Sequence, residues 1–247
     1  MKNNFGNNLP IVNLHKKKNL KSGVDTQLLY GDNFRLVKKY KDWCKIKLKK
    51  DGYMGYVKNI KFTKPFKPNY KVSVLKSSLF YGPNVKMKLK KFLPFNSRLK
   101  IIERKSKFAK FGKFWIKFSD LKNINFKQKD IFKNIEMYKN IKYLWGGTSY
   151  KGIDCSALVQ IFLNQNNKFC PRDSKDQEKY FKKKVDLKSL KKNDLIFWKG
   201  HVAIVMSKKK LIHAYGPMKK VVIMDIRKTI NRIRQTANLK VTSIRRP

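Results

Sequence analysis

The sequence predicts an α+β protein, in which two small β domains precede a larger domain of helices followed by antiparallel strands. Short, partly alternating apolar runs separated by turn residues fill the first half of the chain, and such runs are typical of strands. After residue 125 apolar residues recur at intervals of three or four, which is the spacing of helices, and strand-like runs return near residue 194. With 247 residues, 41% of them hydrophobic, the chain is long enough to form all three domains.

The first β domain is predicted over residues 1–64. Asp51-Gly52, which lies between two strand-like runs, is a strong signal for a hairpin. The order of short strands resembles a bacterial SH3-like domain, a family in which the Asp-Gly-Tyr-x-Gly-Tyr-Val pattern seen here from Asp51 to Val57 is common. The resemblance implies a small β-barrel. The runs extend from Val24 to Ile60 and comprise Gln27–Tyr30, Phe34–Val37, Trp43–Leu48 and Tyr53–Val57.

A second, more diverged SH3-like barrel is predicted over residues 65–125. It follows Lys64-Pro65-Phe66-Lys67-Pro68, a stiff segment that its prolines keep out of helices. Its strand-like runs are Tyr70–Val74, Leu79–Tyr81, Leu99–Ile102 and Phe108–Phe118, and the last of them ends near Leu121.

The third domain is predicted over residues 126–247. Its helices are expected at Phe126–Asn140, Cys155–Asn164 and Ser174–Lys182. Its strands are expected at Asp194–Trp198, His201–Met206, Leu211–Tyr215 and Val221–Asp225. Helices that precede an antiparallel sheet are typical of an α+β domain.

The strong positive charge does not indicate a dedicated nucleic-acid reader. The formal net charge is +46 at pH 7, yet only 9 of the 61 basic residues are Arg, the usual choice for bidentate phosphate and base contacts. Lys is spread along the whole chain. We therefore expect no specific nucleic-acid partner, and only weak, non-specific adhesion at low salt.

Two features of the sequence bear on location. No apolar run approaches the ~18–20 residues that a membrane helix needs, so no membrane span is expected. The N-terminal residues lack a basic segment followed by an apolar stretch, which argues against a secretory signal. A cytoplasmic location is therefore the expectation.

The three cysteines have no metal-binding spacing and are expected to be free thiols. Cys44 falls in a strand-like run, so a place in the core is predicted for it. Cys170 lacks a glycine-rich approach and is interpreted as structural. Cys155 has such an approach, and it is the candidate nucleophile.

Cys155 lies where a thiol is readily activated. Asp154 is of the residue type that caps helices, which puts Cys155 in the first turn of the predicted helix. Unpaired N–H groups at a helix N-terminus favour a thiolate, so we expect the pKa of Cys155 to lie below its ordinary value of about 8.5. The same N–H groups are available to a developing oxyanion. Gly146, Gly147 and Gly152 allow tight turns and leave space for a substrate.

Two of the three histidines follow in strand-like runs, His201 in Gly-His-Val-Ala-Ile-Val and His213 in Leu-Ile-His-Ala. If an odd number of residues connects the two strands, both imidazoles point to the same face as diagonal neighbours, roughly 7–8 Å apart at Cα. His201 can then act as the base for Cys155 while His213 orients it. A four-residue connection would place them on opposite faces. A lone Cys or His is more often a core or surface residue, and only the combination favours a catalytic site.

These motifs resemble those of the NlpC/P60 family of cysteine peptidases, from about Asp130 to Asp225. The resemblance implies a papain-like α+β fold in which Cys155 is the nucleophile, His201 the general base and His213 the residue that orients the base, without a metal or organic cofactor. It also places Tyr143 beside the nucleophile. The matching segments are Tyr-Leu-Trp-Gly-Gly, Gly-Ile-Asp-Cys-Ser-Ala-Leu-Val-Gln, Pro-Arg-Asp-Ser-x-x-Gln, Asp-Leu-Ile-Phe-Trp and Gly-His-Val-Ala-Ile-Val. One departure is Ala157, where the family usually has Gly; it leaves the nucleophile in place.

The order of domains resembles the dipeptidyl-peptidase VI type, which cleaves the bond between γ-D-glutamyl and a diamino acid in murein peptides and prefers a free N-terminal L-Ala. The resemblance implies that Asp154 and Ser156 recognise the α-ammonium group of the substrate. It also implies that Tyr53 or Tyr56 helps to close this end of the cleft, although both tyrosines are equally explained as barrel core or surface residues. Arg172 is interpreted as part of a structural ion pair, with a substrate carboxylate as its alternative partner.

The sequence therefore predicts a cysteine endopeptidase of murein-peptide turnover or recycling. Two alternatives stay open. One is an exported hydrolase that uses the same residues on intact peptidoglycan, and the other is a non-enzymatic basic binding protein. The diamino acid accepted and the oligomeric state are also left open.

Overall fold

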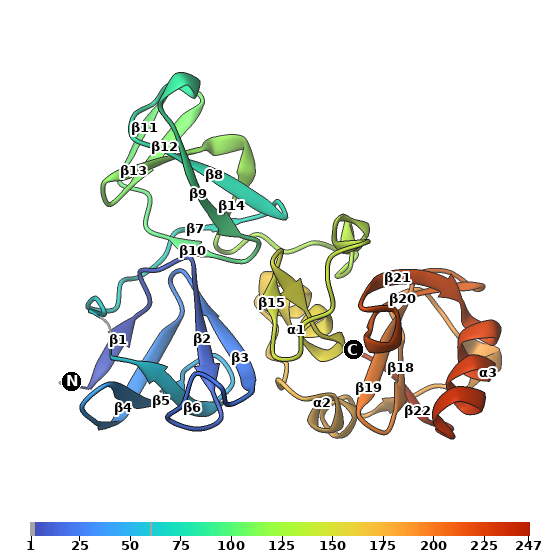
Figure 1. Ribbon diagram of the computed structural model, residues 1–247. Coiled ribbons are helices and arrows are strands. Elements are labelled where there is room, and N and C mark those ends of the chain that lie inside the picture. Colours follow the sequence, from blue (N-terminus) through green and yellow to red (C-terminus); the bar gives the residue numbers. More distant parts are fainter. Residues whose placement is uncertain (1–2, 60) are drawn as a thin grey trace. The chain divides into compact units, whose positions relative to one another are not determined.

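The computed structural model describes residues 3–59 and 61–247 (Figure 1). Contacts within the chain divide it into two units. The first unit runs to Lys127 and also includes Gln165–Asn167, and the second comprises Gln128–Asn164 and Lys168–Pro247. The domain limits predicted at 64/65 and 125/126 stay predictions. Three residues of the predicted first domain, numbers 1, 2 and 60, lie outside the described residues.

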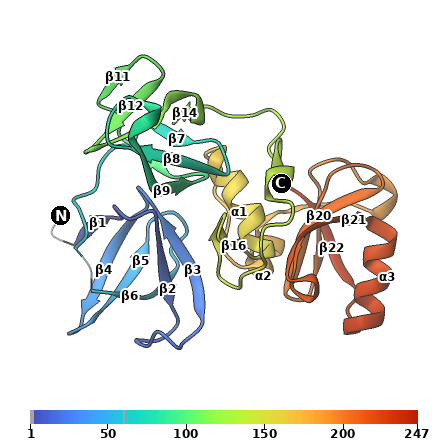
Figure 2. The same cartoon turned by 45° about the horizontal axis from the view of Figure 1, so that its top comes forward.

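An antiparallel sheet of six strands, in the order β1-β4-β5-β6-β2-β3, opens the first unit (Figure 2). It contains all the strands predicted between Val24 and Val57, and two earlier strands that the sequence analysis did not predict. Alternate residues of β5 face the core, where Cys44, Ile46 and Leu48 are buried, as predicted for Cys44. The strands are β1 (Asn4–Gly6), β2 (Ile11–His15), β3 (Val24–Leu29), β4 (Asn33–Lys39), β5 (Trp43–Leu48) and β6 (Met54–Lys58).

The hairpin predicted at Asp51-Gly52 joins β5 to β6. Gly52 has φ of +77°, a left-handed conformation that glycine adopts without strain. The Asp51 side chain accepts a hydrogen bond from the Tyr53 backbone N–H at 3.1 Å, and the Leu48 N–H donates to the Tyr53 carbonyl at 2.8 Å. These contacts close the turn and fix the register in which Lys47 lies opposite Met54.

Two further antiparallel sheets complete the first unit, with strand orders β10-β7-β14 and β11-β12-β13-β8-β9. The run predicted at Phe108–Phe118 is a hairpin rather than one strand, because Gly112 at φ of +51° turns the chain. The strands β9 and β11 were not predicted. Residues of both sheets share one apolar core that includes Val72, Leu99 and Ile116. The elements are β7 (Tyr70–Val72), β8 (Lys76–Phe80), β9 (Lys88–Pro94), β10 (Arg98–Leu99), β11 (Glu103–Lys105), β12 (Phe108–Phe111), β13 (Phe114–Lys117), β14 (Leu121–Asn123) and the 3₁₀ helices η1 (Val85–Met87) and η2 (Phe118–Asp120).

The second unit is built on an antiparallel sheet with the order β17-β22-β18-β19-β20-β21. The four strands predicted after residue 193 are β18 to β21. The strands of the unit are β15 (Thr148–Ser149), β16 (Gly152–Ile153), β17 (Lys183–Lys184), β18 (Leu195–Trp198), β19 (His201–Val205), β20 (Lys210–Tyr215), β21 (Lys220–Asp225) and β22 (Val241–Arg246). Its 3₁₀ helices are η3 (Ile135–Tyr138), η4 (Leu187–Ser189) and η5 (Gly216–Met218).

Two of the three predicted helices are present, as α1 (Cys155–Gln165) and α2 (Ser174–Tyr180). Every residue of α1 is buried, including the polar side chains of Gln160 and Asn164. A third helix, α3 (Ile226–Ala237), was not predicted; Asp225 caps it by accepting a hydrogen bond from the Lys228 N–H at 2.9 Å. This helix packs its buried face, which includes Ile226 and Ile233, on the sheet.

The helix predicted at Phe126–Asn140 is wrong. The segment forms successive turns with hydrogen bonds between residues three apart, and only η3 is helical. Asn134 and Asn140 adopt left-handed conformations, with φ of 65° and 66°, which end a right-handed helix. Apolar residues spaced by three suit 3₁₀ turns as well as an α-helix, so Ile135 and Tyr138 are buried without one.

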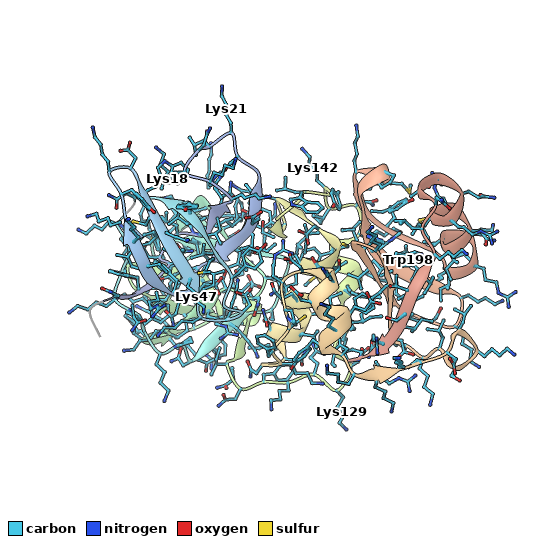
Figure 3. The ribbon with its side chains drawn as sticks, turned by 90° about the horizontal axis from the view of Figure 1, so that it is seen from below. Lys18, Lys21, Lys47, Lys129, Lys142 and Trp198 are labelled. Atoms are coloured by element: carbon cyan, nitrogen blue, oxygen red, sulfur yellow. The ribbon has the colours of Figure 1, made fainter. Side chains whose placement is uncertain are left out.

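Most of the lysines that produce the net charge are exposed, and Figure 3 shows Lys21 and Lys129 projecting outward. They are exposed in different parts of the chain. Among the described residues, no helix has the length and apolar character needed to cross a membrane.

Candidate active site

Asp154 caps the helix that carries Cys155. Its side chain accepts a hydrogen bond from the Ala157 N–H at 2.8 Å, the third residue of the helix counted from the cap. The same carboxylate accepts from the Gly146 N–H at 2.9 Å. Gly146 has φ of 73°, and a Cβ on Gly147 would lie only 2.4 Å from the Gly152 carbonyl oxygen. The glycines therefore allow the loop before α1 to fold tightly around the cap.

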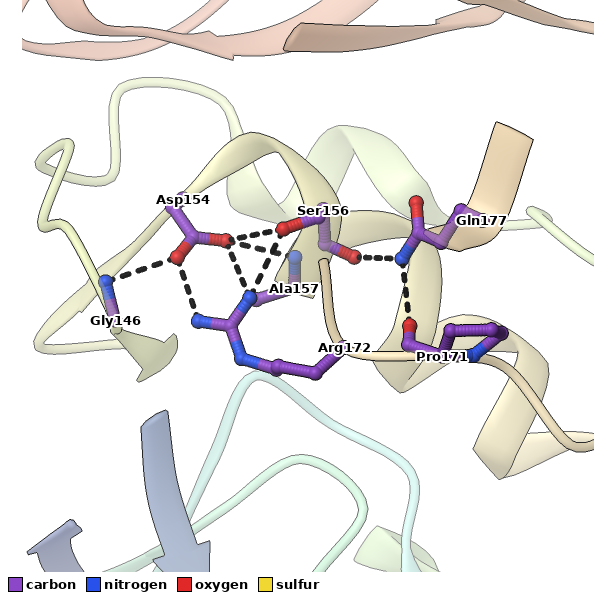
Figure 4. Close-up of polar contacts among 7 residues, drawn as sticks. All are labelled: Gly146, Asp154, Ser156, Ala157, Pro171, Arg172 and Gln177. Carbon is purple, nitrogen blue, oxygen red and sulfur yellow. Dashed lines mark hydrogen bonds and ion pairs between the residues drawn. The ribbon is translucent and has the colours of Figure 1, made fainter. Parts of the chain in front are cut away.

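Arg172 forms a buried, bidentate ion pair with Asp154 (Figure 4). Its Nη2 lies 2.6 Å from Oδ2 of Asp154, and its Nη1 lies 3.0 Å from Oδ1. Nη1 also donates to the Ser156 hydroxyl at 2.9 Å, and that hydroxyl donates to Oδ1 at 3.2 Å. The side chains of Arg172 and Asp154 are only 2% and 8% exposed, so water screens this pair little. The ion pair expected for Arg172 is thus made with Asp154, the residue that caps α1.

Gln177 connects the segment that carries Arg172 to the first turn of α1. Its Nε2 donates to the carbonyl oxygens of Ser156 and Pro171, both at 2.9 Å (Figure 4). Gln177 is fully buried in α2. The segment Pro171–Gln177 is therefore fixed to the first turn of α1 by two independent side chains.

Burial dominates the environment of Cys155. Burial, the larger cause, and the nearby Asp154 carboxylate together raise the pKa of the thiol to about 12. Backbone hydrogen bonds at Val202 and Ser156 and the charge of Arg172 act in the opposite direction. The sequence-based expectation of a lowered pKa is wrong, because desolvation outweighs the helix N-terminus. Cys155 thus rests as a neutral thiol, and it needs a base.

His201 and His213 form a hydrogen-bonded pair. Nε2 of His201 lies 2.8 Å from Nδ1 of His213. The register pairs Val205 with Leu211, so five residues connect these partners, and both imidazoles lie on one face as predicted for an odd connection. Only four residues lie between the ends of β19 and β20, but the pairing rather than the strand ends decides the face.

Both histidines are neutral. Burial lowers the pKa of His201 to about 4, and burial together with His201 lowers the pKa of His213 well below its ordinary value. The ring of Tyr215 stacks on His213 with centroids 4.7 Å apart and planes 12° apart. Because the hydrogen bond engages Nε2 of His201, its Nδ1 is the ring nitrogen available to take a proton.

Residues 140–239 match the model of the NlpC/P60 family, and residues 14–60 match that of the bacterial dipeptidyl-peptidase SH3 domain. The chain carries an NlpC/P60 domain. It is a cysteine peptidase, as the sequence predicted.

Relatives extend the similarity beyond the NlpC/P60 domain. The γ-D-glutamyl-L-lysine dipeptidyl-peptidase of Bacillus subtilis (strain 168) is 28% identical over 232 residues, which cover 84% of this chain and 77% of the relative. The enzyme of the same name from Bacillus cereus (strain ATCC 10987 / NRS 248) is 25% identical, over 77% of this chain and 67% of the relative. A crystal structure of an NlpC/P60 family protein from Bacillus cereus ATCC 10987 has a TM-score of 0.84 at 21% identity, and covers 98% of this chain and 99% of that chain. It shows the same fold.

The remaining predicted site residues lie in different places. Burial raises the pKa of the Tyr143 hydroxyl, and the nearby Asp154 carboxylate acts in the same direction. Tyr53 packs against the core of the first sheet, and Tyr56 lies opposite Lys45 in that sheet. Both belong to the first unit, and their role in substrate binding stays a prediction.

Two predictions about neighbouring residues concern packing. Ala157 is fully buried in α1 and donates its N–H to Asp154, so the methyl group is accommodated without displacing the cap. Cys170 is buried, and its carbonyl accepts a hydrogen bond from Gln160 at 3.0 Å, which fits the structural interpretation. All three cysteines are free thiols, as predicted.

Sequence reasoning did not assign Gln177 or Met224, whose thioether sulfur lies 3.5 Å from Nε2 of His213. Gln177 lies within the Pro-Arg-Asp-Ser-x-x-Gln motif, which was a usable signal. Met224 lies in a strand-like run and has no polar group, so nothing in the sequence distinguishes it from a core residue.

Proposed function

We propose that the protein is a cysteine endopeptidase that hydrolyses the bond between γ-D-glutamate and a diamino acid in murein peptides with a free N-terminal L-Ala. The observation that carries this proposal is the 2.8 Å hydrogen bond between two neutral histidines, next to a buried thiol that is hydrogen-bonded at the Val202 backbone. Val202 directly follows His201 in β19, so the thiol of Cys155 in α1 contacts the residue next to the base. The names of the two Bacillus relatives supply the substrate class.

The first step transfers the thiol proton of Cys155 to Nδ1 of His201. The thiolate attacks the γ-carbonyl carbon of D-glutamate, and its sulfur forms a bond to that carbon as the carbonyl π electrons move to oxygen. Backbone N–H groups at the start of α1 are available to stabilise this oxyanion. The imidazolium of His201 donates its Nε2–H to Nδ1 of His213, and this hydrogen bond is stronger when the donor is charged.

The second half of the reaction releases the products. The C–N bond breaks as His201 passes its proton to the departing amine of the diamino acid, which leaves a thioester on Cys155. His201 then removes a proton from water, and the hydroxide attacks the thioester. The L-Ala-γ-D-Glu product leaves, and Cys155 recovers its proton from His201. Neutral resting states of both residues suit this sequence, because His201 must start without a proton.

We assign the recognition of the free α-ammonium group to Asp154 and Ser156. Both lie at the start of α1 beside Cys155, and a carboxylate is the natural partner of an ammonium group. Asp154 already accepts from Arg172, Gly146 and Ala157, so its capping and ion-pair roles hold it in one orientation. A carboxylate that needs no rearrangement binds a cation at lower entropic cost.

A substrate with a free L-Ala terminus is a fragment of murein rather than the intact polymer. We therefore propose that the protein acts in murein-peptide recycling and that it works in the cytoplasm. Three free cysteines are compatible with a reducing compartment. The excess of lysines favours the approach of a carboxylate-rich peptide through a diffuse field.

The test compares L-Ala-γ-D-Glu-L-Lys and L-Ala-γ-D-Glu-diaminopimelate, each with a free and with an acetylated N-terminal amine. Cleavage of the free-amine forms alone is the expected result. Equal cleavage of free and acetylated forms would contradict amine recognition and favour a hydrolase of intact peptidoglycan. If none of the four peptides is cleaved, the proposed substrate class is wrong.

A further inference from the structure

Met224 extends the histidine pair across a third strand. His213 in β20 lies opposite Val222 in β21, and Met224 is two residues further along β21 on the same face. His201, His213 and Met224 thus form a diagonal line over β19, β20 and β21. Nε2 of His213 lies 3.5 Å from the Met224 sulfur, within the range of a hydrogen bond to sulfur.

The two contacts of His213 are sensitive to its tautomer. A neutral imidazole carries one proton, so one ring nitrogen donates and the other accepts. A thioether sulfur accepts hydrogen bonds weakly and cannot donate. The Nε2–H tautomer of His213 therefore donates to Met224 and leaves Nδ1 to accept from His201. The other tautomer would place a nitrogen lone pair against the sulfur, and it would donate Nδ1–H to His201.

The tautomer of His213 decides which nitrogen of His201 is basic. When His213 accepts at Nδ1, His201 carries its proton on Nε2, and its Nδ1 is free to take the proton of Cys155. When His213 donates instead, Nε2 of His201 must accept, and the proton of a neutral His201 moves to Nδ1. That form of His201 cannot act as the base in the proposed mechanism.

We propose that Met224 is a positioning residue whose thioether accepts the Nε2–H of His213 and so holds the histidine pair in the tautomer that leaves His201 ready to deprotonate Cys155. The proposal rests on the proposed peptidase mechanism, and it adds a residue that touches neither substrate nor thiol.

The surroundings of Met224 explain why an uncharged acceptor suits this position. Met224 also lines a cavity of about 330 Å³ together with Glu136, Lys139, Met206, Lys210, Ile223 and Asp225. A carboxylate in contact with His213 would favour its doubly protonated form, which donates at both nitrogens. A thioether instead leaves His213 neutral, so that Nδ1 keeps its lone pair. The ring of Tyr215 stacks on the face of the His213 ring, so it does not compete with Met224 for the Nε2–H, which lies in the imidazole plane.

The test uses ¹⁵N-histidine labelling, because the chain has only three histidines. His15, in the first sheet, serves as an internal reference for the spectrum. In the native protein we expect His213 to be protonated at Nε2 and bare at Nδ1. In Met224→Leu, which keeps an apolar side chain of similar size and removes the acceptor, the two ring nitrogens of His213 should show mixed tautomers.

Activity and rescue complete the test. Loss of a weak acceptor should lower kcat by about threefold to tenfold in Met224→Leu with KM unchanged. Met224→Gln, whose side-chain oxygen again accepts a hydrogen bond, should restore the native tautomer and most of kcat. Met206 lines the same cavity but is not the residue whose sulfur contacts His213. Met206→Leu should therefore change neither the tautomer of His213 nor kcat.

The outcomes separate this proposal from the function it rests on. An unchanged His213 spectrum in Met224→Leu overturns the positioning role whatever the substrate. A changed spectrum without loss of kcat on a cleaved peptide overturns the link to catalysis. If the native protein cleaves no murein peptide, the proposed function fails, while the His213 spectra of the native protein and Met224→Leu still test the tautomer. If Met224→Leu fails to fold, Met224→Gln carries the test, and a native-like fold with altered tautomers in that variant overturns the proposal.

Discussion

Replacement of Arg172 with Met should destabilise the first turn of α1, because Arg172 forms a buried ion pair with the residue that caps it. The substitution keeps an unbranched side chain but ends it before the guanidinium group, which removes both hydrogen bonds to Asp154 and the one to Ser156. Breaking a buried ion pair from one side typically costs about 3–5 kcal/mol, because the remaining charge is left buried. Asp154 keeps the Gly146 N–H, the Ala157 N–H and the Ser156 hydroxyl as donors, so we expect the lower end, about 3 kcal/mol.

Hydrogen exchange measures this change locally. At 1.36 kcal/mol for each factor of ten, a cost of about 3 kcal/mol speeds exchange of the α1 amides by roughly 100-fold to 200-fold. Amides of the first sheet, which lies in the other unit, should be unaffected. The control is Lys110→Met, which breaks the exposed pair with Glu103 and should cost less than about 1 kcal/mol. Because Asp154→Asn removes the orphaned charge, the double variant should recover part of the loss.

Two outcomes would contradict this expectation. If exchange in α1 of Arg172→Met rises less than about tenfold, the loss is below about 1.4 kcal/mol, and the ion pair with Asp154 does not stabilise the start of the helix. If the double variant is as destabilised as the sum of the single variants, the two side chains act independently, which contradicts the bidentate contact.

Three further predictions concern the chemistry. Cys155→Ala should abolish peptide hydrolysis and leave the circular dichroism spectrum unchanged. Cys44→Ala and Cys170→Ala, which remove thiols that take no part in the proposed reaction, should keep most of the activity. Full activity in Cys155→Ala would exclude a mechanism in which this thiol is the nucleophile. His201 must be neutral to accept a proton and burial lowers its pKa to about 4, so kcat/KM should persist on acidification and fall as the pH drops through about 4. A pH–rate profile with its acidic limb at or above 6.5, the ordinary value for histidine, contradicts this assignment. His213→Ala removes the acceptor for Nε2 of His201 and should lower kcat about 100-fold, the lower end of the effect of acid–base groups; a loss below threefold in steady-state kinetics would show that His213 does not orient the base.

The fold could be predicted where local signals and tertiary structure agree. The hairpin at Asp51-Gly52 follows from glycine in a left-handed turn, which depends only on local chemistry. The helix α3 was missed although Asp225 and Asn238, its N-cap and C-cap, are readable signals, because many exposed basic residues mask its apolar face. At Phe126–Asn140 the spacing was read as one helix, whereas two asparagines in left-handed conformations divide it into turns.

The candidate site divides in the same way. That His201 and His213 lie on the same face of the sheet could be predicted. Side chains alternate along a strand, so the face depends only on whether the number of residues that connect the two strands is odd or even. The ion pair between Asp154 and Arg172 could not, because it joins residues 18 positions apart through the fold. The raised pKa of Cys155 could not be predicted from the sequence either, because it depends on how completely the folded protein excludes water from the thiol.

The most direct test of the central claim is the stoichiometry of inactivation by iodoacetamide, with the alkylated residue located by peptide mapping. The mechanism predicts that the fraction of activity lost equals the fraction of Cys155 alkylated, while Cys44 and Cys170 remain unmodified. Full activity with Cys155 completely alkylated, or complete loss of activity with Cys155 free, would show that this thiol is not the nucleophile.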